Sequence, residues 1–141
     1  MSLLTFTPPQ YLRIVRASAA YDLAVTWVFA LPWTFAWVYG LLQNIAGSLA
    51  LPGNFPPLNP AHVLMANLLG SVVVVWSLAR WLQPSVQLGR LDALARALFA
   101  IWQIYAVMQG ASAIILAFTV FEIVFGVLQM ARVRSEQRRG S

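Results

Sequence analysis

Apolar residues gather in four long stretches of the chain, over residues 17–39, 61–82, 90–108 and 113–131. Each stretch is close to the roughly 20 residues that an α-helix needs to cross the hydrocarbon core of a bilayer. Polar residues are concentrated between the stretches and after the last one. The pattern therefore predicts an all-α integral membrane protein, a four-helix bundle that forms a single domain over residues 1–141.

The segments between these stretches carry the usual signals for turns and helix ends. Residues 40–60 are rich in proline in their second half and predict an irregular outer loop, although residues 41–49 could form a short helix on the membrane surface. Asn59 followed by Pro60 is typical of an N-cap and a first helical position. Pro32 interrupts the first stretch, so a kink is expected there. Residues 132–141 form a polar C-terminal tail.

The basic residues predict how the helices are oriented. All nine are arginines, and each lies beside an apolar stretch on what a simple topology makes the same side. Residues 40–60 and 109–112 contain neither lysine nor arginine. Because short loops rich in arginine stay in the cytoplasm, both termini are expected inside, in a multi-pass protein of the inner membrane. The nine residues are Arg13, Arg16, Arg80, Arg90, Arg96, Arg132, Arg134, Arg138 and Arg139.

Composition narrows the classes of partner and chemistry. Only 9% of the residues are charged, against about 25% in a soluble domain, and the net charge is +5. Arginines at helix ends suit anionic lipid headgroups of the bilayer, and no clustered basic surface for nucleic acid is expected. With no cysteine, one histidine and four carboxylates, neither a metal site nor another cofactor is expected. Arginine without lysine, together with abundant alanine, suggests a GC-rich bacterial genome.

Five polar residues within the apolar stretches form a candidate intramembrane site. They are Asp22, Asp92, Arg96, Gln103 and Glu122. A charge at the bilayer centre costs about 2.5–3.5 kcal/mol or more, so each should have a partner or a purpose. Helical spacing puts Asp92, Arg96 and Gln103 on one face of their helix, and Glu122 on a second polar face with Thr119 and Gln129. We expect these faces to pack inward and to form an inner-leaflet cluster.

Structural and functional interpretations compete for each of these residues. Asp92 and Arg96, at i and i+4, can form a simple ion pair, and Asp22 can neutralise Arg96. Glu122 lies ten residues before Arg132, roughly 15 Å deep. At that depth it either binds Gln103 or Thr119 through hydrogen bonds, or carries protons.

A second candidate site lies at the outer side, at the start of the second stretch. His62 falls in the first turn of that helix, and Asn67 lies one and a half turns deeper. The two do not share a helical face. The simplest interpretation of His62 is an ordinary interfacial residue.

The motif R-x-D-x-x-x-R at Arg90, Asp92 and Arg96, with Tyr21-Asp22 and Pro32 in the first stretch, resembles the DoxX-like set of small bacterial membrane proteins. The resemblance implies a fold of four short membrane helices. Sterol-isomerase-like membrane proteins differ in having paired acidic residues and a histidine on inner faces. Small multidrug exporters carry their membrane glutamate in the first helix, whereas Glu122 is in the fourth.

Three functions remain open at this point. The first is a non-enzymatic inner-membrane protein, either an accessory subunit of a larger membrane complex or a binder of a lipophilic small molecule. The second is a proton-coupled transporter that works as a homo-oligomer and uses Glu122. The third is a membrane enzyme on a lipid or isoprenoid substrate, with Asp22 and Glu122 as acid and base; no catalytic residue is otherwise assigned. Pairing of Glu122 with Arg96 would favour a structural role, and an unpaired Glu122 that faces a wet cavity would favour transport. A closed apolar pocket that ends at two carboxyls would favour binding or isomerase chemistry.

Overall fold

The computed structural model describes residues 4–134, and its regular structure is almost entirely helical. A short strand β1 (Thr5–Phe6) precedes α1 (Pro8–Thr26), which continues into the 3-10 helix η1 (Trp27–Ala30). The chain then forms α2 (Pro32–Ser48), α3 (Pro60–Leu82), α4 (Val86–Met108), α5 (Ile115–Met130) and the strand β2 (Arg132–Val133). The all-α prediction is confirmed.

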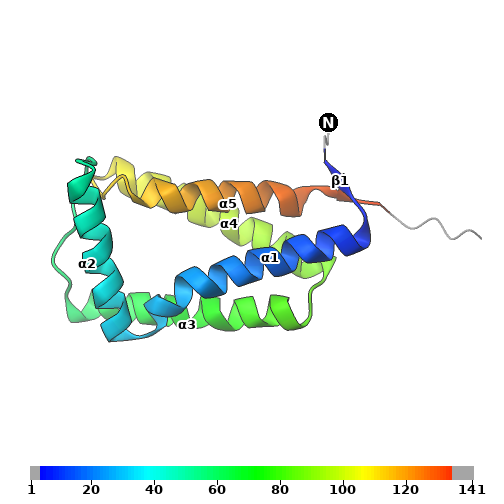
Figure 1. Ribbon diagram of the computed structural model, residues 1–141, viewed down its shortest axis with the longest axis horizontal. Coiled ribbons are helices and arrows are strands. Elements are labelled where there is room, and N and C mark those ends of the chain that lie inside the picture. Colours follow the sequence, from blue (N-terminus) through cyan, green and yellow to red (C-terminus); the bar gives the residue numbers. More distant parts are fainter. Residues whose placement is uncertain (1–3, 135–141) are drawn as a thin grey trace, which may run out of the picture.

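Helix α1 runs through the middle of the bundle (Figure 1). It packs chiefly on α3 on one side, and touches both α4 and α5 on the other. Helices α4 and α5 form the most extensive pairing, as expected for two helices joined by a tight turn at residues 109–114. A polar residue on α1 can therefore reach α3, α4 and α5.

The first apolar stretch does not form the expected helix over residues 17–39. Helix α1 begins at Pro8, because Thr7 and Gln10 form a capping box that starts the helix well before the apolar residues. The chain bends by 107° at the break before Pro32, where a kink was expected. The residues after the bend belong to α2, which extends to Ser48. The first part of the expected outer loop over 40–60 is therefore helical, as the alternative of a short helix over 41–49 predicted.

Helix α2 lies across one end of the bundle (Figure 1). The segment after it is tied to the α4–α5 turn by two backbone hydrogen bonds, from the Asn54 N–H to the Gly110 carbonyl and from the Ala113 N–H to the Pro52 carbonyl. The Tyr39 hydroxyl donates to the Pro56 carbonyl at 2.6 Å. The remaining helix starts lie near the predicted ones, and Asn59 caps α3 by accepting from the His62 backbone N–H at 3.0 Å.

The opposite end of the bundle holds the first and last described residues. Strands β1 and β2 pair in parallel, with Thr5 beside Arg132 and Phe6 beside Val133. Arg90 donates to the carbonyls of Gln129 and Ala131, at 2.9 and 2.7 Å, and the Tyr11 hydroxyl donates to the Gln129 carbonyl at 2.6 Å. These donors satisfy carbonyls that the end of α5 leaves without helical partners.

Two helices, α3 and α4, are long and apolar enough to cross a membrane, and a third span results if α1 and α2 count as one bent span. Helix α5 is apolar but has only 16 residues. The distribution of side chains agrees with a lipid environment. Large apolar residues such as Val75 and Leu82 on α3 are about two-thirds exposed, whereas charged residues such as Arg80 and Arg96 are buried.

Candidate functional site: a buried ionic cluster between two grooves

Two buried arginines hold together the polar faces of four helices. Arg80 on α3 is fully buried, and Arg96 on α4 is 2% exposed. Arg80 binds Asp22 on α1 at 2.5 Å and Asp92 on α4 at 2.7 Å. Arg96 binds Asp22 at 2.7 Å, Asp92 at 2.9 Å and Glu122 on α5 at 2.8 Å. We call these five residues the ionic cluster.

The two aspartates lie between the arginines. One oxygen of Asp22, Oδ2, accepts from Nη2 of both Arg80 and Arg96. Asp92 uses both oxygens, since Oδ2 accepts from Arg80 Nη1 and Arg96 Nε while Oδ1 accepts from the Trp76 indole N–H at 2.9 Å. Charges removed from water to this degree are tolerated only when such hydrogen bonds replace their hydration.

Neutral side chains add further hydrogen bonds to the cluster. The Ser18 hydroxyl donates to Asp92 at 2.9 Å and accepts from both arginines at 2.8 Å. The side-chain amide of Gln129 on α5 donates to the Ser18 oxygen at 3.0 Å. Ser18 and Gln129 are both fully buried, so they position the charges and are closed to solvent.

Glu122 is the member of the cluster with the fewest hydrogen bonds. Its Oε2 accepts one hydrogen bond, from Arg96 Nη1, and its side chain keeps 12% of its surface exposed. Phe125, one turn further along α5, stacks against the Arg96 guanidinium at 5.0 Å from the ring centroid.

The cluster holds one more carboxylate than arginine. With all five groups ionised, three carboxylates and two guanidinium groups carry a formal charge of −1. In a region of low dielectric constant, an unbalanced charge of this kind is costly unless a partner or a polar group compensates it.

One apolar groove reaches the cluster from between α3 and α4. It has a volume of about 360 Å³. We call it the α3–α4 groove. Helices α3 and α4 pack mainly on other helices, α3 on α1 and α4 on α5, which leaves this space between them. Its lining residues are Asp22, Leu69, Val72, Val73, Trp76, Asp92, Ala95, Arg96, Phe99 and Glu122.

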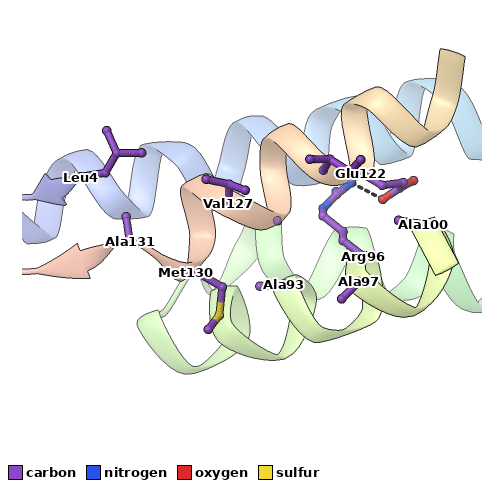
Figure 2. Close-up of a pocket in the computed structure, with 11 residues that line it drawn as sticks. Leu4, Ala93, Arg96, Ala97, Ala100, Glu122, Val127, Met130 and Ala131 are labelled. Atoms are coloured by element: carbon purple, nitrogen blue, oxygen red, sulfur yellow. Dashed lines mark hydrogen bonds and ion pairs between the residues drawn. The ribbon is translucent and has the colours of Figure 1, made fainter. Parts of the chain in front are cut away.

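A second, more open groove lies between α4 and α5 (Figure 2), with a volume of about 540 Å³. We call it the α4–α5 groove. Small residues of α4, namely Ala93, Ala97 and Ala100, form one wall, and Val127 and Met130 of α5 form the other. In Figure 2 the Arg96 side chain rises from α4 to meet Glu122 on α5. Because both residues line both grooves, the Arg96–Glu122 ion pair lies at the boundary between them.

Four of the five residues of the candidate intramembrane site meet in the cluster, namely Asp22, Asp92, Arg96 and Glu122. Gln103 does not join them. Its side-chain oxygen accepts from the Thr119 hydroxyl at 2.8 Å, so Gln103 and Thr119 bind each other and Glu122 binds Arg96.

His62 and Asn67 do not form an outer site. His62 is exposed at the start of α3. Asn67 donates its side-chain amide to the Phe29 carbonyl at 2.8 Å. It therefore satisfies a carbonyl of η1, close to the bend that leads into α2, and its role is structural.

The membership of Arg80 in the ionic cluster was not predicted from the sequence, where Arg80 was expected at the membrane surface as a flanking charge. Arg80 has the same burial as the core and two carboxylate partners, so it is not available to lipid headgroups. A signal was present in the spacing, since Gly70, Ser77 and Arg80 follow steps of 7 and 3 and share one face of α3. All three are buried.

The arrangement gives little support to metal chemistry. Over residues 4–134, no group of three or more histidine, cysteine or acidic residues has the geometry to hold a metal ion. The carboxylates of the cluster are directed at arginines instead. Comparisons of the chain with protein-family models, with curated proteins and with solved structures give no match. The site therefore has to be interpreted from its own chemistry.

Proposed function

We propose that this protein is a small, non-enzymatic inner-membrane protein that binds a lipophilic molecule in the α3–α4 groove. The observation that carries the proposal is the groove itself, whose apolar walls end at the buried ionic cluster. A volume of about 360 Å³ lies in the range of ligand pockets, which are mostly apolar with a few polar groups that orient the ligand. A ligand with an apolar body and one polar end would match apolar walls that end at a polar cluster.

The proposal includes the topology of four membrane helices with both ends inside, in the manner of the DoxX-like proteins. Three observations support it. The two short strands near the chain ends pair with each other, Arg90 and Arg132 lie at that same end of the bundle, and residues 40–60 at the other end (Figure 1) contain no basic residue. Helix α5, at 16 residues, is about 24 Å long and would cross with help from the turn before it.

Transport driven by protons is less well supported than binding. A proton carrier needs a carboxyl that is free to exchange with a wet cavity, and Glu122 is held by Arg96 at 2.8 Å. Acid–base catalysis meets the same difficulty, since Asp22 is bound by two arginines.

A pair of matched variants tests the proposed groove. Ala95 lines the α3–α4 groove, and Ala97, two residues away on α4, lines only the α4–α5 groove. We expect Ala95→Phe to fill the first groove and Ala97→Phe to leave it open. Lipophilic molecules that copurify with the protein in mild detergent would be extracted and identified by mass spectrometry. A molecule enriched over the bulk lipid should be lost from Ala95→Phe and kept by Ala97→Phe. Equal lipid profiles for the wild type and Ala95→Phe would contradict the proposal.

A further inference from the structure

The α4–α5 groove extends along α5 from the end of the bundle that carries the two strands toward its middle. Leu4 and Ala131 lie at one end of the groove, and Ala100 and Glu122 lie at the other (Figure 2). Ala131 follows Glu122 by nine residues, which is a rise of about 14 Å along a helix. One leaflet contributes about half of the roughly 30 Å hydrocarbon core. In the proposed topology the groove therefore spans the inner leaflet, from the membrane surface to the bilayer centre.

The walls of this groove suit an apolar chain. Val127 and Met130 of α5 line one side, and Ala97 of α4 lines the other. The two charged lining residues, Arg96 and Glu122, bind each other at the deep end and are almost entirely buried. They need no polar partner from an occupant. The volume of about 540 Å³ lies in the range of ligand pockets, so a single chain could occupy the groove.

Two exposed arginines lie beside the surface end of the groove. Arg132 directly follows Ala131, and its backbone N–H donates to the Leu4 carbonyl at 3.2 Å, so it adjoins two lining residues. Arg134 continues the pairing of β2 with β1 by one more backbone hydrogen bond. Side chains two residues apart along a strand point to the same face. Both arginines are exposed, and neither forms an ion pair within the described part of the chain.

The positive charge at this end suits an anionic headgroup. The carboxylates of Asp22, Asp92 and Glu122 are all bound to arginines of the ionic cluster, so they do not offset Arg132 and Arg134. A guanidinium group can bind two oxygens of one phosphate with parallel hydrogen bonds. Basic residues at the cytoplasmic surface are also attracted by the anionic lipids of that leaflet. A molecule with an apolar chain and an anionic phosphate matches both the groove and the charge beside it.

We infer that the α4–α5 groove binds an anionic phospholipid of the inner leaflet, with one acyl chain along α5 and the headgroup phosphate on Arg132 and Arg134. This site lies on the other side of the Arg96–Glu122 ion pair from the α3–α4 groove. It does not depend on what the α3–α4 groove binds. A chain in the groove would also shield the Arg96–Glu122 ion pair from water.

Two lipids that differ only in the headgroup test the charge of the ligand. The purified protein would be freed of lipid in a mild detergent and titrated with phosphatidylglycerol or phosphatidylcholine that carry the same acyl chains. Native mass spectrometry counts the lipids bound to each protein and gives their affinities. We expect the first phosphatidylglycerol to bind at least about tenfold more tightly than the first phosphatidylcholine. Equal affinities for the two lipids would overturn the inference.

Paired arginine variants test the location of the headgroup. Arg132→Gln combined with Arg134→Gln should weaken binding of phosphatidylglycerol by about fivefold for each arginine removed, and should leave phosphatidylcholine almost unchanged. Arg13→Gln combined with Arg16→Gln removes the same charge from exposed positions of α1 that do not line the groove. This control should bind phosphatidylglycerol like the wild type. Equal losses in the two double variants would mean that the lipid responds to the overall charge, and would overturn the site.

A second pair of variants tests the location of the acyl chain. Ala97→Phe should fill the α4–α5 groove and abolish the tight binding of phosphatidylglycerol, whereas Ala95→Phe, in the α3–α4 groove, should retain it. Unchanged binding in an Ala97→Phe variant that melts like the wild type would overturn the inference. A wild-type dimer that persists with phosphatidylglycerol and dissociates in Ala97→Phe would identify a second copy of the chain as the occupant, and would also overturn it.

Discussion

Arg80 on α3 and Asp92 on α4 form a buried ion pair of 2.7 Å, although the two helices pack mainly on other partners. The pair connects the α1–α3 half of the bundle with the α4–α5 half. Asp22 on α1 and Arg96 on α4 make a second connection of the same kind, at 2.7 Å. Ionic contacts, and not apolar packing alone, therefore hold the walls of the α3–α4 groove in place.

Removal of Arg80 should be strongly destabilising. Arg80→Ala strips Asp22 and Asp92 of one cation, and breaking a buried pair on one side costs about 3–5 kcal/mol. Arg80→Lys should recover only part of the loss, since one ammonium group cannot repeat the two-pronged contact of a guanidinium. Thermal melting of the purified variants in detergent would measure the loss of stability in Arg80→Ala and in Arg80→Lys. Arg13→Ala, at an exposed position of α1, is the control and should stay within about 0.5 kcal/mol of the wild type. Equal melting temperatures for the Arg80 and Arg13 variants would contradict this role.

Arg96 and Asp22 should be energetically coupled. Arg96→Ala leaves three carboxylates with Arg80 as the one remaining cation of the cluster, so a loss of a few kcal/mol is expected. Adding Asp22→Asn removes one of the stranded charges and should restore part of that stability. A double-mutant cycle from detergent melting gives the coupling free energy, which should exceed about 0.5 kcal/mol. Strictly additive effects would mean that the 2.7 Å contact contributes nothing.

Glu122→Gln should fold as well as the wild type or slightly better. A neutral amide costs less to bury than a carboxylate, and Arg96 retains both aspartates as partners. Expression and melting temperature are the measurements. A fall of several degrees would show instead that the Arg96–Glu122 ion pair is needed for the fold. A normal melting temperature with loss of a phenotype of the intact gene would support a proton-carrying role.

Gly70 should not tolerate alanine, because of the close approach of η1 to α3. A Cβ atom at Gly70 would lie 2.5 Å from the carbonyl carbon of Phe29 and 2.6 Å from the nitrogen of Ala30, and backbone atoms cannot move aside as a flexible side chain can. We expect Gly70→Ala to cost about 1–3 kcal/mol. Gly40→Ala is the control, since nothing lies within 4 Å of its added Cβ in the middle of α2. That variant should gain about 0.5–1 kcal/mol in helix stability, measured by the same melting experiment.

The proposed topology can be tested by labelling single cysteines, since the chain has none of its own. Pro57→Cys lies in the exposed segment between α2 and α3 and should react with a membrane-impermeant maleimide in intact spheroplasts. Ser141→Cys should react only after the inner membrane is permeabilised, because arginine-rich ends stay inside. The opposite pattern of labelling would overturn the orientation with both ends inside.

The linear pattern of the chain determined the helical class, the start of α3 at Asn59 and Pro60, and the inward location of most polar residues. These features depend on interactions within a few residues. An N-cap bonds to the next turn, and polar residues at helical spacing must share a face whatever surrounds them. The i, i+4 ion pair of Asp92 and Arg96 could be predicted for the same reason, and it forms at 2.9 Å.

Only the tertiary structure decided how the charges pair and how far the first helix extends. Arg80 ends an apolar stretch just as a surface arginine does, and its burial follows from the approach of α1 and α4, which are distant in the sequence. The separation of α2 from α1 depends on the 107° bend and on the bonds that tie the segment after α2 to the α4–α5 turn. The α3–α4 groove is likewise a property of packing. It exists because α3 packs mainly on α1 and α4 packs mainly on α5. Periodicity can show that Arg80 shares a helical face with Gly70 and Ser77, but it cannot show which helices that face meets. The cluster was therefore foreseen in part and the groove was not.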